Sequence, residues 1–181
     1  MVEIEPQVEA VARQFFKLPD DPQRIQIHHA DGADFIIQTK QKYDLILVDG
    51  FDNKARAGRL DALPFYLDCK ARLAKEGLLC INLLARRKSF NHSIQQIKEA
   101  FDGHVISFPS RDEGNAIALA SANQPNAASP TPSGWIPLRI TFAELQTAAQ
   151  ALKKSTHLNL LPALTGIAQS GLIAGSTLQF G

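Results

Sequence analysis

Between residues 1 and 121, the apolar positions of the chain switch between a strand-like and a helix-like spacing. Short apolar runs predict strands at 2–5, 25–29, 43–49, 77–83, 104–109 and 115–121. Helix-like spacing separates most of these strands, and that alternation is typical of βαβ units. The pattern therefore predicts an α/β, Rossmann-like fold, with a mostly parallel sheet that has helices on both faces. A charged turn between the last two strands predicts that the sheet closes with a C-terminal antiparallel hairpin.

Three sets of apolar residues recur at helical spacing and predict helix faces that pack in the core. The sets are Val8, Val11, Ala12, Phe15 and Phe16; Phe65, Tyr66, Cys69 and Leu73; and Ile94, Ile97 and Phe101. The strands at 43–49 and 77–83 are almost continuously apolar, which is expected when both faces of a strand are covered.

The composition changes after residue 121, where residues 122–134 are rich in Asn, Pro, Ser and Ala. This stretch predicts a linker between a domain at 1–121 and a helical C-terminal extension at 135–181. Thr141 and Glu144 have the spacing of a capping box, which predicts a helix to about Lys154. Residues 158–181 carry no charge but are too polar for a membrane span, so they favour a packed helix or a segment that faces a partner.

Composition and charge exclude several classes of function. The 181-residue chain has a formal net charge of +1, which gives no basis for binding nucleic acid or an acidic membrane surface. Cys69 and Cys80 lie in apolar contexts without metal-ligand spacing, and His28 and His29 also lack further ligands, so we expect reduced thiols and no metal. The sequence shows no secretory signal, which favours a cytoplasmic location.

Acidic residues follow three of the predicted strands, at the tips where open α/β sheets bind ligands. Glu3 is placed to hold both hydroxyls of a ribose, and Asp31 is placed to accept from an adenine amine, with Gly32 allowing close approach. Asp49 and Asp52 form a carboxylate pair, in which one acid can act as a general base while the other positions a cationic nucleophile. Each also has a simpler interpretation, because acids at such positions often only cap a helix or turn.

The order of these motifs resembles the spermidine synthase family, the polyamine aminopropyltransferases with a methyltransferase-like Rossmann fold. The resemblance runs from Val2 to about Ser121. The matching stretches are Val2-Glu3-Ile4-Glu5, Ala30-Asp31-Gly32, Tyr43 to Asp49 with Asp52, Leu63-Pro64-Phe65-Tyr66, and Leu73 to Cys80. They resemble, in turn, the family's ribose-binding strand, its adenine-binding motif, its catalytic strand, the start of its next helix, and the turn and strand after that helix.

The resemblance implies a role for each candidate. Glu3, with Ile4, would bind the ribose of decarboxylated S-adenosylmethionine, and Asp31, with Gly32, would bind its adenine. Asp52 would take a proton from an amine such as putrescine. Asp49 would help to anchor that amine and would also contribute to binding the cofactor. The resemblance implies no metal, and it implies a homodimer with a small-molecule amine as substrate.

The chain also differs from the family pattern. The family's N-terminal domain, first strand and glycine-rich turn have no counterpart in these 181 residues. That strand lies between those at 2–5 and 43–49, which would therefore pair directly, leave a gap or recruit a neighbour's strand. Lys54, Arg56 and Arg59 lie in the loop beside the acids, which favours an acceptor less cationic than putrescine. Two alternatives remain: an S-adenosylmethionine-dependent methyltransferase with a non-cationic acceptor, and a non-catalytic nucleoside-binding or assembly domain.

Overall fold

The computed structural model describes residues 1–52, 54–108, 114–121, 141–169, 173–174 and 177–178. The N-terminal elements are β1 (Val2–Glu3), α1 (Pro6–Phe16), β2 (His28–His29), α2 (Gly32–Gln38), β3 (Tyr43–Val48) and the 3-10 helix η1 (Gly58–Leu60). They are followed by α3 (Leu63–Arg72), β4 (Leu73–Leu84), α4 (Phe90–Ala100), β5 (Val105–Phe108) and β6 (Asn115–Ser121). The C-terminal elements are α5 (Phe142–Thr156), α6 (Leu161–Gln169), β7 (Ile173–Ala174) and β8 (Thr177–Leu178).

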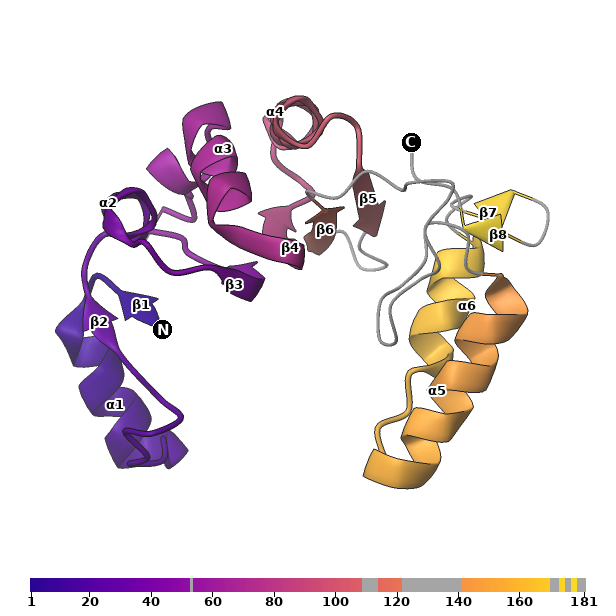
Figure 1. Ribbon diagram of the computed structural model, residues 1–181, viewed down its shortest axis with the longest axis horizontal. Helices are drawn as coiled ribbons and strands as arrows, with labels where there is room; N and C mark the ends of the chain where they lie inside the picture. Colours follow the sequence, from indigo (N-terminus) through magenta and orange to yellow (C-terminus); the bar gives the residue numbers. More distant parts are fainter. Residues whose placement is uncertain (53, 109–113, 122–140, 170–172, 175–176, 179–181) are drawn as a thin grey trace.

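The described strands up to β6 form two sheets rather than one. β1 and β2 pair in parallel, and a second sheet has the order β3-β4-β6-β5, in which β3 and β4 are parallel and β6 is antiparallel to both of its neighbours. Helices α2, α3 and α4 lie on one side of the strands and α1 lies on the other (Figure 1). The predicted α/β fold with a closing β5–β6 hairpin is therefore confirmed, with a mixed second sheet.

A gap separates the two sheets, since no described residue of β1 or β2 pairs with β3. Of the three arrangements expected for these strands, the structure shows this one. A groove of about 360 Å³ lies here, lined by residues that include Val2, His28, Phe35 and Tyr43.

The first strands are shorter than predicted, for local reasons. Glu5 is the N-cap of α1, with its side chain accepting from the Gln7 N–H at 3.4 Å, and Pro6 occupies the first helical turn. Because Pro has no N–H to give a sheet and favours the start of a helix, β1 ends at Glu3. Before β2, the backbone N–H of Ile25 donates to the Asp21 carbonyl at 2.7 Å, so the chain turns there instead of extending.

The core lies between the second sheet and helices α3 and α4. Tyr66, Cys69, Ile97 and Phe101 are all fully buried, as the helical spacing predicts. In β4, Leu79 is one of several buried residues that alternate with partly buried ones, so this strand is covered as expected.

Two of the core predictions are wrong. None of the residues of α1 is buried, and Phe15 and Phe16 are 67% and 78% exposed. In β3, Leu45 and Leu47 are 52% and 68% exposed. The spacing of apolar residues identified the helix and the strand correctly, but burial requires a partner, and no described element covers these faces.

The C-terminal extension contains two packed helices, α5 and α6. The Thr141 hydroxyl accepts from the Glu144 N–H at 3.2 Å, and the Glu144 carboxylate accepts from the Thr141 N–H at 2.7 Å, which confirms the capping box. Ala149 on α5 and Leu164 on α6 are buried. The predicted linker at 122–134 lies outside the described residues, and within them no helix is long and apolar enough to cross a membrane.

Candidate functional site

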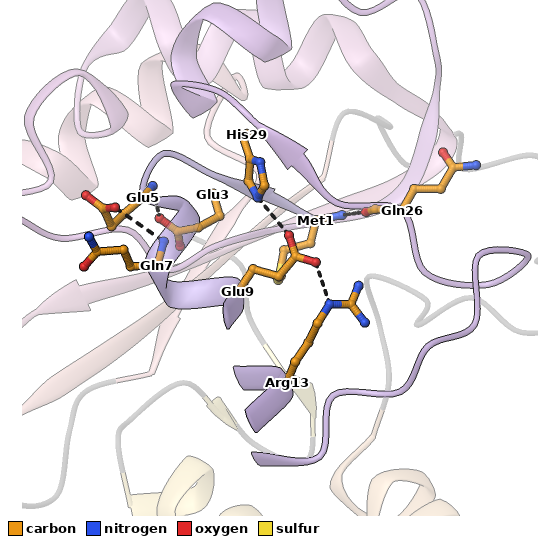
Figure 2. Close-up of polar contacts among 8 residues, drawn as sticks. All are labelled: Met1, Glu3, Glu5, Gln7, Glu9, Arg13, Gln26 and His29. Atoms are coloured by element: carbon orange, nitrogen blue, oxygen red, sulfur yellow. Dashed lines mark hydrogen bonds and ion pairs between the residues drawn. The ribbon is translucent and has the colours of Figure 1, made fainter. Parts of the chain in front are cut away.

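Glu3 ends β1, and Asp31 lies two residues after β2, the adjacent parallel strand. Glu3 is in register with His29, and the Glu3 carbonyl accepts from the Ala30 N–H at 3.1 Å, so the carboxyl ends of β1 and β2 lie side by side. The Glu3 carboxylate accepts from the Glu5 N–H at 2.8 Å (Figure 2). Ile4, the next residue, is 68% exposed. This edge therefore presents both predicted nucleoside-binding positions.

Asp31 serves as the N-cap of α2. Its Oδ1 accepts from the Ala33 N–H at 2.7 Å and from the Asp34 N–H at 3.3 Å. Its Oδ2 lies 3.4 Å from the Arg59 guanidinium, which also contacts Asp34 at 2.7 Å. The simpler interpretation of Asp31 as a helix cap is thus observed, and its second oxygen has a cationic partner.

The Asp52 carboxylate is fully engaged within its own loop. Its Oδ1 accepts from the backbone N–H groups of Lys54 and Arg56, each at 2.8 Å. Its Oδ2 accepts from Arg56 Nε at 2.7 Å and forms an ion pair with Arg56 Nη2 at 2.7 Å. Asp49, at the end of β3, instead accepts from the Asn82 side-chain amide at 2.8 Å, so each acid of the predicted pair has its own donors.

These contacts decide the direction of the Asp52 pKa. The hydrogen bond from the Arg56 side chain, with further bonds from the Arg56 and Lys54 backbone, lowers the pKa of Asp52 below its ordinary value. Mutual repulsion between two carboxylates would have raised it. Asp52 is therefore ionised at neutral pH and can accept a proton only as a weak base while Arg56 remains in place.

Leu60 places the end of β3 next to the start of α2. A Cβ added at Gly50 would lie 2.6 Å from Leu60 Cδ1, and one added at Gly32 would lie 3.4 Å from Leu60 Cδ2. The absence of a side chain at Gly50 therefore makes room for Leu60, which also packs against the core, whereas a Cβ at Gly32 would only touch it. Through this residue and the Arg59 contacts, residues 54–60 join the surroundings of Asp31 to those of Asp52.

A second group of polar side chains lies behind this segment. Asp61 accepts from the Tyr66 hydroxyl at 2.6 Å and from the Ser93 hydroxyl at 2.8 Å. The Arg87 guanidinium donates to the Lys54 carbonyl at 2.7 Å. The cavity beside these residues is about 30 Å³, which holds about one water and no substrate. The Arg87 contact therefore holds the segment after β3 in place.

Sequence reasoning found the acids but not their partners. The positive charge of Arg56 and Arg59 was visible, whereas their pairing with Asp52 and Asp31 depends on how the segment folds. Asn82 gave no signal, because a single amide in an apolar strand is not a motif. Among the described residues, no group of three His, Cys, Asp or Glu side chains could hold a metal ion.

Comparison with known protein families shows which family the chain belongs to. Residues 1–108 match the model of the spermine/spermidine synthase domain. The chain belongs to the spermine/spermidine synthase family. It is 36% identical over 145 residues to the polyamine aminopropyltransferase of Chromobacterium violaceum, a match that covers 80% of this chain and 54% of the relative. The chain spans about half the length of the curated relatives it matches.

Solved structures support the same fold. Human methyltransferase-like protein 13, in complex with SAH, superposes with a TM-score of 0.66 at 23% identity, over 87% of this chain and 70% of that protein. A spermidine synthase in complex with the transition-state analogue AdoDATO superposes with a TM-score of 0.60 at 20% identity, over 84% of this chain and 59% of that protein. At these identities the likeness is one of fold.

Proposed function

We propose that this chain acts in aminopropyl transfer from decarboxylated S-adenosylmethionine to an amine such as putrescine. Membership of the spermine/spermidine synthase family supports this reaction class. The match to residues 1–108 includes all the acids that we assign to the site. No metal takes part in the proposal, because a sulfonium is already a good leaving group and proximity supplies much of the acceleration.

In the proposed reaction, the amine gives a proton to Asp52 and its nitrogen attacks the methylene beside the sulfonium. A C–N bond forms as the C–S bond breaks, and the electron pair of that bond stays on sulfur. Asp49 anchors the amine, Glu3 with Ile4 holds the ribose, and Asp31 with Gly32 holds the adenine. Both Asp31 and Asp52 must exchange arginine contacts for ligand contacts before this can happen.

The observation that carries the proposal is the position of Leu60. It lies near both Gly32, next to Asp31, and Gly50, two residues before Asp52, and so brings the two neighbourhoods close to one side chain. A nucleoside on the first acid and an amine on the second would then be neighbours, as a direct displacement requires.

The test is product analysis with decarboxylated S-adenosylmethionine and putrescine, using the Chromobacterium relative as the positive control. We expect spermidine and methylthioadenosine, and we expect Asp52→Asn to abolish turnover with nearly unchanged affinity for methylthioadenosine. Asp20→Asn, on a side chain that is 91% exposed and lies 3.8 Å from Arg13, is the matched control. A parallel loss of nucleoside affinity in Asp52→Asn would show that its role is misassigned.

A methyltransferase is the second candidate, and one observation favours it. Arg56 lies against Asp52, the acid that would receive a cationic amine. Methyl transfer from S-adenosylmethionine to a neutral or anionic acceptor, without aminopropyl transfer, would favour this candidate. Absence of methylthioadenosine binding at millimolar concentration would favour the third alternative, a non-catalytic domain.

We also propose that the chain works as a homodimer in the cytoplasm. The exposed apolar side chains of α1 and β3 support association with a second copy, since such surfaces are seldom left in water. Cys69 and Cys80 are both free, which supports a reducing compartment.

A further inference from the structure

The segment after β3 places its own cations on the acids of the proposed site. Arg56 binds Asp52 through two nitrogen atoms, and Arg59 bridges Asp31 and Asp34. A guanidinium that makes two contacts to one carboxylate is a strong partner for it. An ammonium group that approaches Asp52 must therefore compete with Arg56 for the same oxygens.

The segment has limited freedom to move its arginines far away. Leu60 lies close to Gly50 and packs against the core at one end, and the Lys54 carbonyl is held by Arg87 at the other. The Asp52 backbone N–H also donates to the Arg56 carbonyl at 2.9 Å, which closes the turn around the carboxylate. When a ligand displaces the Arg56 side chain from Asp52, the guanidinium thus stays within reach of that ligand.

From this geometry we infer that Arg56 is a specificity-determining residue that selects an amine carrying its own carboxylate over a diamine. Such a zwitterion replaces both halves of the existing ion pair, because its ammonium binds Asp52 while its carboxylate binds the displaced Arg56. A diamine satisfies only Asp52 and brings a second positive charge next to the guanidinium. The acceptor class is thus an ω-amino acid. This inference rests on the proposed function of the site.

The test compares two ligands with the same spacer, putrescine and δ-aminovalerate. Their affinities are measured by calorimetric titration of the whole chain in the presence of saturating methylthioadenosine. We expect the wild-type chain to prefer δ-aminovalerate. In Arg56→Gln the ratio of the two affinities should move about tenfold toward putrescine, because loss of the guanidinium weakens one ligand and favours the other.

Arg13→Gln is the matched control. Arg13 forms an ion pair with Glu9 four residues away, just as Arg56 does with Asp52 (Figure 2). The Arg13→Gln variant therefore removes the same charge from a residue that contacts no site acid. A ratio that moves no further in Arg56→Gln than in Arg13→Gln overturns the inference, and so does a wild-type preference for putrescine. Methylthioadenosine binding is measured first. If the chain does not bind methylthioadenosine, the proposed function is overturned, and the inference that rests on it is overturned as well.

Discussion

At the scale of single residues, the Tyr66 hydroxyl is a polar group on a fully buried side chain, and it donates to Asp61. Tyr66 is fully buried, and burial together with its bond to Asp61 raises the pKa of its phenol. Tyr66→Phe would leave Asp61 with one donor fewer in a partly buried place, which costs about 1–3 kcal/mol of unfolding free energy. Urea denaturation measures this loss. Tyr43→Phe, which removes a less buried hydroxyl, should change stability by much less.

Asp52 gives a second prediction at this scale, concerning its pKa. In Arg56→Gln the pKa of Asp52 should rise toward its ordinary value, because the largest cause of its lowering is the Arg56 side-chain bond. A carboxyl with a lowered folded-state pKa stabilises the fold above the unfolded pKa, and this contribution disappears as pH falls through the folded pKa. Carbonyl-detected NMR titration reads the pKa directly. An unchanged value in the variant would contradict the contact.

At the scale of elements, Gly77 controls how β3 pairs with β4. A Cβ at this position would lie 2.7 Å from the Tyr43 carbonyl and 3.0 Å from the Ala74 nitrogen, both of them backbone atoms. The register between the strands also shifts between Tyr43 and Leu45. Gly77→Ala should therefore destabilise the chain by about 1–3 kcal/mol, since backbone cannot easily move aside.

Gly50→Ala is the comparison for that variant. Its added Cβ would meet only the end of the Leu60 side chain, which can rotate away. We expect a smaller loss of stability from Gly50→Ala than from Gly77→Ala in urea denaturation. Equal losses would mean that the Leu60 side chain is as fixed as the backbone, and that residues 54–60 are more rigid than their contacts indicate.

The elements also show which features of the fold could be predicted from the sequence alone. Helices α3 and α4 were predictable with their buried faces, because their partners lie in the same stretch of chain. For α1 the helix was predictable but its burial was not, since burial is a property of the neighbouring element. The acids at the strand ends were equally predictable, whereas the Arg59–Asp31 contact joins residues 28 positions apart and depends on the fold of the segment between them.

At the scale of the whole molecule, the two sheets leave edges and apolar faces that the described chain does not use. β3 pairs with β4 on one edge and has no described partner on the other. Leu45 and Leu47 are exposed on β3, and Phe15 and Phe16 are exposed on α1. Unpaired edges and large apolar patches favour association in water. These exposed surfaces therefore favour the binding of a partner.

If a second copy covers this surface, the sedimentation coefficient of the chain should rise with concentration toward the value of a dimer. Phe15→Ser with Phe16→Ser removes two of the most exposed aromatic side chains from α1 and should shift the equilibrium toward monomer. Folding should be little affected, because neither ring is part of the core. Leu158→Ser, on a 53% exposed residue of the C-terminal extension, is the control and should leave the equilibrium unchanged. A wild-type chain that sediments as a monomer at every concentration would exclude the homodimer. The exposed faces of α1 and β3 would then be expected to bind a different polypeptide.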